Sequence, residues 1–144
     1  MKIKKILILS ICCLLLVGCK KEQKLVCEKD YQENLGNYQE KVEFTFEKDK
    51  LTYYTQKFTF NCLNDECVDE VGDNYLAELD NIVSYGLSKD FNKEGNIITI
   101  TFSSSAENIK AAAINNNVKP YIDTNLKKED YINNMQSNGY FCQK

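Results

Sequence analysis

The chain contains no histidine, no arginine and no tryptophan, and it has one proline in 144 residues. Without histidine, neither a Ser-His-Asp nor a Cys-His catalytic arrangement can form, and zinc sites with imidazole ligands are excluded. Without arginine, the chain has no planar, bidentate clamp for phosphate groups. These absences remove several common catalytic and metal-binding mechanisms.

The amino terminus has the layout of a secretory signal. Lysines stand at positions 2, 4 and 5, and an apolar run follows from Ile6 to Val17. A basic segment followed by about a dozen apolar residues is typical of a signal peptide. A membrane span needs roughly 20 apolar residues, so this run is too short, and Lys20 and Lys21 close it.

The end of the apolar run is more specific. Leu16-Val17-Gly18-Cys19 resembles the lipobox of bacterial lipoproteins. The resemblance implies cleavage before Cys19, thioether attachment of a diacylglyceryl group, and, in some bacteria, acylation of the new amino terminus by a fatty acid such as palmitate. Two acyl chains attach a protein durably, whereas one chain binds reversibly. An ordinary signal with a chance cysteine and an uncleaved helix are the alternatives.

The lipobox divides the chain into three parts. Residues 1–18 are expected to be a signal peptide, residues 19–24 a lipidated tether, and residues 25–144 a single domain on the extracytoplasmic face of the cell membrane. Loss of the signal removes three lysines and no acid, so the net charge falls from −3 to −6. An acidic domain argues against nucleic acid as a partner. Lys20, Lys21 and Lys24 beside the anchor could touch lipid headgroups, but a solvated tether is the favoured interpretation.

Four cysteines remain after the lipidated one: Cys27, Cys62, Cys67 and Cys142. Disulfides persist outside the cytoplasm, and four cysteines allow three connectivities. The economical pairing joins the neighbours Cys62 and Cys67, and joins Cys27 at the start of the domain to Cys142 at its end. Loop entropy assigns about 2 kcal/mol to the short loop and about 5 kcal/mol to the long one.

The stretch Cys-Leu-Asn-Asp-Glu-Cys has other interpretations. A redox centre would use Cys62 and Cys67, but redox motifs favour a gap of two residues. Free thiols are a second alternative. The cysteine spacings do not suit a four-thiolate metal site, and the Asp-x-Asp-x-Asp-Gly order of a calcium loop is absent. We therefore expect a structural disulfide, no metal and no cofactor.

Alternating apolar residues predict an antiparallel sheet. Val42, Phe44 and Phe46, for example, share one face of a strand. The alternation slips between Tyr53 and Tyr54, which predicts a bulge or an edge position. Strands are expected at residues 24–30, 41–47, 51–60, 95–102 and 140–144, with a turn at 48–50.

Helical spacing predicts the elements that cover this sheet. One long helix is expected within residues 67–91, a short helix opens with a capping box of Ser104 and Glu107, and a last helix within 126–139 stops at Gly139. An irregular segment with a short extended piece at 118–122 lies between the last two. The fold class is therefore α+β, an antiparallel sheet with helices packed on one face. The stripe of the long helix consists of Tyr75, Leu76, Leu79, Ile82, Val83 and Leu87.

Three stretches give the chain a family resemblance: "LVGCKK" at the lipobox, "KLVCEKD" at the start of the domain and "YINNMQSNGYFCQK" at its end. With the "KVEFTFEKDKLTYYTQKFTF" hairpin between them, the chain resembles small lipoproteins of AT-rich Gram-positive bacteria, the YehR-like group among them. The resemblance implies a membrane-anchored α+β domain with its terminal cysteines paired. It implies no activity, and "NCLNDEC" does not belong to its pattern.

These features favour a lipoprotein that is not an enzyme and that binds an envelope protein, an envelope polymer or a small ligand. A structural envelope spacer and a thiol-disulfide protein using Cys62 and Cys67 are the alternatives. A hydrolase with paired carboxylates is a further possibility, but nothing in the sequence places two acids in one cleft. Tyr38 and Tyr54 could mark an exposed contact surface, although core packing explains most aromatic residues.

Overall fold

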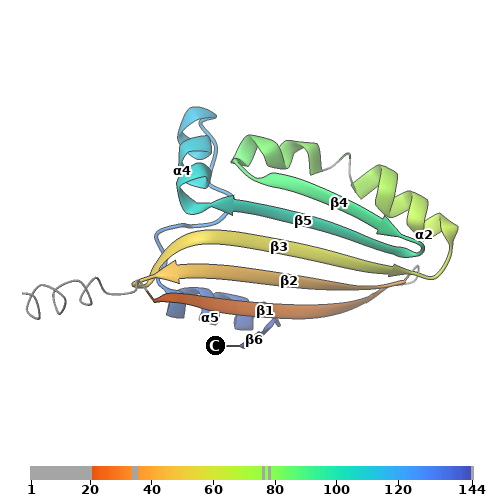
Figure 1. Ribbon diagram of the computed structural model, residues 1–144, viewed down its shortest axis with the longest axis horizontal. Helices are drawn as coiled ribbons and strands as arrows, with labels where there is room; N and C mark the ends of the chain where they lie inside the picture. The colour runs from red at the N-terminus through yellow and green to blue at the C-terminus, as the bar shows by residue number, and fades with distance from the viewer. Residues whose placement is uncertain (1–20, 34–35, 76, 78, 144) are drawn as a thin grey trace, which may run out of the picture.

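The computed structural model describes residues 21–33, 36–75, 77 and 79–143. The expected signal peptide and Cys19 lie outside these residues. The described chain forms a six-stranded sheet in the order β4-β5-β3-β2-β1-β6, as Figure 1 shows, and every neighbouring pair is antiparallel. The strands are β1 (Glu22–Glu33), β2 (Gly36–Glu47), β3 (Lys50–Cys62), β4 (Ser88–Glu94), β5 (Ile97–Ser105) and β6 (Phe141–Gln143).

One face of the sheet is buried beneath helices. Ile98, Ile100 and Phe102 alternate along β5 and are completely buried, whereas the threonines between them are partly exposed. The helices packed against this face include α4 (Ala106–Asn115) and α5 (Lys128–Ser137), and α5 passes behind β1 in Figure 1. The predicted α+β class, with helices on one face, is therefore confirmed. No helix in the described ranges is long and apolar enough to cross a membrane.

A tight hairpin joins β2 to β3. Lys48 and Asp49 both have positive φ angles, 48° and 62°, as a two-residue turn that matches the twist of the strands requires. Thr45 pairs with Tyr53 but Phe46 pairs with Leu51, so Thr52 is an extra residue in β3. The slip in alternation between Tyr53 and Tyr54 predicted a bulge or an edge position; β3 is an inner strand, and the bulge lies at Thr52.

The first strand begins earlier than the sequence indicated. Glu22, Gln23 and Lys24 pair with Glu47, Phe46 and Thr45, so residues 22–24, which were expected to belong to the tether, are part of β1. The start of β1 and the β2–β3 turn consequently lie at the same end of the sheet.

The long helix predicted within residues 67–91 was wrong. The segment instead contains α2 (Asp65–Asp69), η1 (Glu70–Tyr75) and η2 (Leu79–Tyr85), and then strand β4. Ile82 and Leu87 are buried as expected, but Val83 is 61% exposed; the side chains of Tyr75, Leu76 and Leu79 lie outside the described part. Gly86, with a φ of 78°, ends the helical stretch. Strand β4 was missed because an exposed edge strand carries no apolar alternation.

Two smaller expectations also differ from the structure. The cap of α4 is Ser105, whose side chain accepts from the Asn108 amide at 3.1 Å, whereas Ser104 donates to the Gly86 carbonyl. Ser104 is unavailable as a cap because it lies on the buried face of β5. The segment at 118–122 is irregular as predicted, but it contains no strand.

Candidate functional site

Two disulfides hold the domain together. Cys27 is bonded to Cys142 with an S–S distance of 2.05 Å, and Cys62 is bonded to Cys67. This is the pairing that the spacing favoured. Two disulfides in so small a domain are typical of an oxidising, extracytoplasmic environment.

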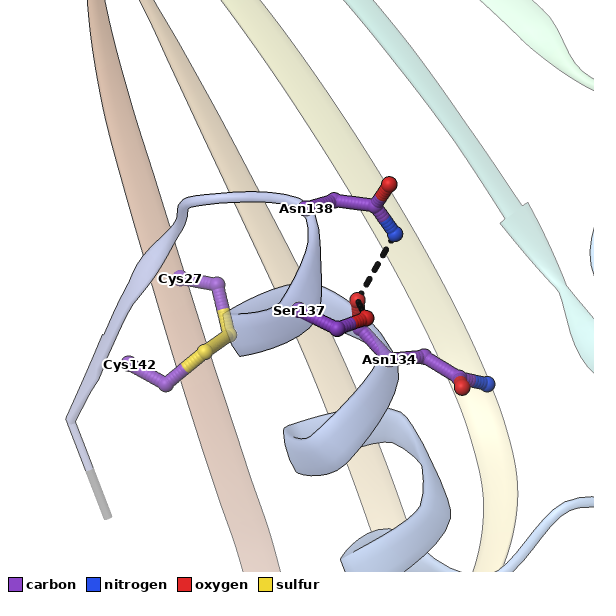
Figure 2. Close-up of a disulfide and its surroundings, with 5 residues drawn as sticks. All are labelled: Cys27, Asn134, Ser137, Asn138 and Cys142. Atoms are coloured by element: carbon purple, nitrogen blue, oxygen red, sulfur yellow. Dashed lines mark hydrogen bonds between the residues drawn. A yellow bond between two sulfur atoms is a disulfide. The ribbon is translucent and has the colours of Figure 1, made fainter.

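The terminal disulfide and the end of α5 together place Tyr140. Figure 2 shows the side-chain amide of Asn138 bonded to the backbone oxygen of Asn134, beside the Cys27–Cys142 bond. The amide of Tyr140 donates to the Met135 carbonyl, and Gly139 has a φ of 83°. This glycine-based cap ends the helix where the sequence predicted, and the chain then turns back to pair with β1.

Glu40 is the centre of a buried polar network. It lies on the covered face of β2 in phase with Val42 and Phe44, and it is 7% exposed. The phenol groups of Tyr140 and Tyr31 donate to its Oε2 at 2.5 and 3.2 Å. Two neighbouring strands and the chain after α5, 100 residues farther on, therefore meet on one carboxylate.

Gln56 on β3 extends the network. Its Nε2 donates to Oε1 of Glu40 at 2.6 Å, and its Oε1 accepts from the phenol groups of Tyr54 and Tyr121, both at 2.8 Å. Every buried side-chain nitrogen and oxygen in the described residues has a partner. The network is thus complete, and complete networks hold buried polar groups at defined positions.

Burial raises the pKa of several of these phenols. The pKa of Tyr54 lies well above its ordinary value because the ring is removed from water and faces other acidic groups. The pKa of Tyr140 is raised by burial and by its hydrogen bond to Glu40, which favours the protonated phenol. Both groups therefore act as hydrogen-bond donors at neutral pH.

A cavity of about 330 Å³ opens beside this network, between the sheet and α5. This volume is at the lower end of the range for small-molecule sites, which runs from roughly 300 to 1,000 Å³. The lining combines apolar and aromatic side chains with a few polar ones: Glu40, Val42, Phe44, Tyr54, Gln56, Ile122, Asp123, Leu126, Tyr131, Asn134, Met135 and Tyr140. Such a composition is typical of ligand pockets.

Lys29 is a cation that lies near the network. Its ammonium lies 4.8 Å from the ring centre of Tyr31 and 5.4 Å from that of Tyr140, and it donates to the Asn138 carbonyl. Two ion pairs between described residues are Lys24–Glu43 and Lys41–Glu28. Neither of them neutralises Glu40.

A wider groove of about 820 Å³ lies at the end of the sheet where β1 begins. Its charged lining residues alternate in sign, with lysines 48, 50, 110 and 127 beside Glu47, Asp49 and Glu107. A mixed surface of this kind selects no ligand by charge. The cavity beside Glu40, whose polar groups are buried and held in place, is the stronger candidate.

The sequence analysis did not identify this site. Tyr54, proposed as an exposed contact residue, is 3% exposed and belongs to the core, while Tyr38 is partly buried and stacks on Tyr31. Glu40 and Gln56 were not predicted because such side chains are mostly exposed in folded proteins. One signal existed, since Glu40 continues the alternation of Val42 and Phe44 with a charged residue.

Comparison with known proteins shows similarity in fold. No protein-family model and no curated protein matches the chain. A solved NMR structure of a protein from Streptococcus pneumoniae TIGR4 is similar, with a TM-score of 0.56, 11% sequence identity and 88% of each chain covered. At this identity, the likeness concerns the fold alone.

Proposed function

We propose that the protein is a lipid-anchored, extracytoplasmic binding module of the kind found in the YehR-like lipoproteins, and that its ligand site is the cavity beside Glu40. The observation that carries the proposal is a buried carboxylate, held by three hydrogen bonds, in the wall of an aromatic cavity. Buried polar groups reduce stability relative to a well-packed apolar core. A binding role is one reason for a chain to keep such a group.

The anchor half of the proposal rests on the lipobox-like sequence ending at Cys19. The two disulfides support an extracytoplasmic location. Mass spectrometry of protein extracted from its native membrane should report an acyl mass on Cys19 and no residues 1–18. An intact Met1, or an unmodified Cys19 in membrane-extracted protein, would contradict this half.

Binding explains the site better than the alternatives do. A thiol-disulfide role would use Cys62 and Cys67, but these residues are 6% and 5% exposed, and exchange needs access to a sulfur. A hydrolase with paired carboxylates would need two acids in one cleft, whereas of the two acids that line the cavity Glu40 is buried and Asp123 is exposed. A spacer would require no cavity.

The binding half can be tested with a natural probe. The chain has two methionines, Met1 and Met135, so the processed protein retains only Met135, which lines the cavity. Detergent-extracted protein labelled with carbon-13 at the methionine methyl group should show a saturable shift of this signal with at least one member of a panel of small cations, anions, sugars and neutral compounds.

Two variants of neighbouring residues on α5 localise any binding. Asn134 is exposed and lines the cavity, whereas Asn133 is exposed and does not. Asn134→Phe should abolish the shift by filling the entrance, and Asn133→Phe should retain it. If no compound shifts the Met135 signal, or if Asn134→Phe binds as well as Asn133→Phe, the cavity is not the ligand site.

A further inference from the structure

The cavity beside Glu40 has charged groups of one sign. Among its lining residues, Glu40 and Asp123 are acidic, and none is a lysine. Glu40 is buried in the wall, and Asp123 is exposed on the segment that precedes α5. An anionic ligand would therefore meet two like charges, and like charges across a site cost binding energy.

The hydrogen bonds of Glu40 leave an opening for a donor. An ionised carboxylate offers about four acceptor positions, and Glu40 uses two on Oε2, for Tyr31 and Tyr140, and one on Oε1, for Gln56. The Gln56 oxygen already accepts two hydrogen bonds. Of the two carboxylate oxygens, Oε1 of Glu40 therefore has an acceptor position left for a further donor.

The partners of Glu40 are neutral donors. Phenols and an amide satisfy its hydrogen bonds but do not cancel its charge, and a buried charge without a counter-ion is costly. Lys29 lies over the rings of Tyr31 and Tyr140, where its ammonium donates to the Asn138 carbonyl. It forms no ion pair with Glu40 in the described part of the chain. A cationic ligand would supply the charge that the protein does not.

The aromatic walls favour the same ligand. Phe44, Tyr54, Tyr131 and Tyr140 line the cavity, and aromatic rings attract organic cations through their negative faces. The position of Lys29 over Tyr31 and Tyr140 shows this interaction within the protein itself. The apolar residues Val42, Ile122, Leu126 and Met135 accommodate a hydrocarbon part.

We propose that the cavity binds a small organic ammonium ion with at least one N–H group, which donates to Oε1 of Glu40 and places its apolar part between the sheet and α5. This inference rests on the proposed function and specifies its ligand class. A volume of about 330 Å³ restricts the ligand to a small amine.

The test uses four probes that share one ring: benzylammonium, benzyltrimethylammonium, benzyl alcohol and benzoate. Each is titrated into the detergent-extracted protein while the Met135 methyl signal is followed. Benzylammonium should bind at least about tenfold more tightly than benzyl alcohol, and benzoate should be the weakest, because the site is anionic. Benzyltrimethylammonium, which has the charge but no N–H, should bind less tightly than benzylammonium.

Charge-removing variants test the role of Glu40. Glu40→Gln should remove most of the preference for benzylammonium over benzyl alcohol, whereas Glu43→Gln, on the opposite face of β2, should leave the preference unchanged. Asp123→Asn provides a second measure if Glu40→Gln does not fold, and it should reduce the preference for benzylammonium several-fold.

The outcomes separate this inference from the proposed function. If benzyl alcohol or benzoate binds as tightly as benzylammonium, the ammonium ligand is wrong, but the cavity is still a binding site. The same holds if the preference for benzylammonium is unchanged in both Asp123→Asn and Glu40→Gln. Equal binding of benzyltrimethylammonium overturns the hydrogen bond to Glu40. If the four probes leave the Met135 signal unmoved, the ammonium ligand is wrong, and the wider panel decides whether the cavity binds anything else.

Discussion

The side-chain nitrogen of Gln56 lies 2.6 Å from the Glu40 carboxylate, although the two residues are on different strands and 16 residues apart. Val42 is the residue directly opposite Gln56, so Glu40 and Gln56 are diagonal neighbours on the covered face of the sheet. This bond connects two groups of tyrosines, Tyr31 and Tyr140 on one side and Tyr54 and Tyr121 on the other. Several measurable properties depend on it.

Replacement of Glu40 by alanine should reduce the free energy of unfolding by about 3 kcal/mol, because the buried Gln56 amide and the partly buried phenols of Tyr31 and Tyr140 lose their acceptor. Glu43→Ala is the matched control on the same strand, since it removes only an exposed pairing with Lys24, and it should change stability far less. Guanidinium unfolding under oxidising conditions measures the free energy of unfolding of both variants. Similar losses in the two variants would show that the network contributes little.

The two disulfides should differ in their contribution to stability. The Cys27–Cys142 bond closes a loop with a sequence separation of 115, and the Cys62–Cys67 bond one with a separation of 5. Loop entropy predicts a loss of about 5 kcal/mol for the double variant Cys27→Ala/Cys142→Ala and about 2 kcal/mol for Cys62→Ala/Cys67→Ala. Denaturant midpoints of the two double variants should follow this order, and the reverse order would contradict it.

High pH should unfold the domain through its buried phenols. Burial holds the pKa of Tyr54, Tyr131 and Tyr140 above the ordinary value, so the unfolded chain releases these protons first. The stability that these protonated phenols contribute to the folded state is complete below about pH 10, the pKa of a free phenol. It is lost as the pH rises above that value. The phenolate absorbance of these tyrosines should therefore appear together with the loss of circular dichroism.

Tyr140→Phe provides the control for this pH dependence. The variant lacks one of the phenols with a raised pKa, so its stability should fall less steeply above pH 10 than that of the native protein, even if it is less stable at neutral pH. An unchanged slope would show that Tyr140 ionises at the same pH in the folded and unfolded chains.

Two glycines in the helical segment should respond oppositely to alanine. Gly86 has a φ of 78°, and a Cβ there would lie 2.6 Å from the Asn108 carbonyl oxygen. Gly86→Ala should therefore lower the free energy of unfolding by about 2 to 3 kcal/mol. Gly72 has open space around it, so Gly72→Ala should be neutral or stabilise the protein by up to about 1 kcal/mol. Thermal unfolding distinguishes these outcomes.

The elements predicted correctly are those whose pattern is local. Val42, Phe44 and Phe46 alternate with polar residues, and this period of two specifies a strand with one buried face. Gly139 follows a helical pattern and ends α5. Strand β4 had no such pattern, because an exposed edge strand does not need apolar residues at every second position. Gly86 ends the helical stretch before Leu87, the last residue of the predicted stripe.

The candidate site could not be predicted in the same way. Tyr31, Glu40, Gln56 and Tyr140 belong to four different segments, and nothing in their spacing relates one to another. A tyrosine in an alternating strand suits the core and the surface equally. For this reason Tyr54 was predicted to be exposed although it is buried.

The sequence alone determined the properties that follow from local pattern and composition: the class of the fold, the bulged hairpin, the cysteine pairing favoured by spacing, and the absence of histidine and arginine chemistry. The tertiary structure decided where the buried charge lies. Antiparallel pairing of β1, β2 and β3 and the return of the chain after α5 bring Tyr31, Gln56 and Tyr140 to Glu40. A carboxylate can remain buried only where several donors converge on it, and that convergence depends on segments separated by up to 100 residues.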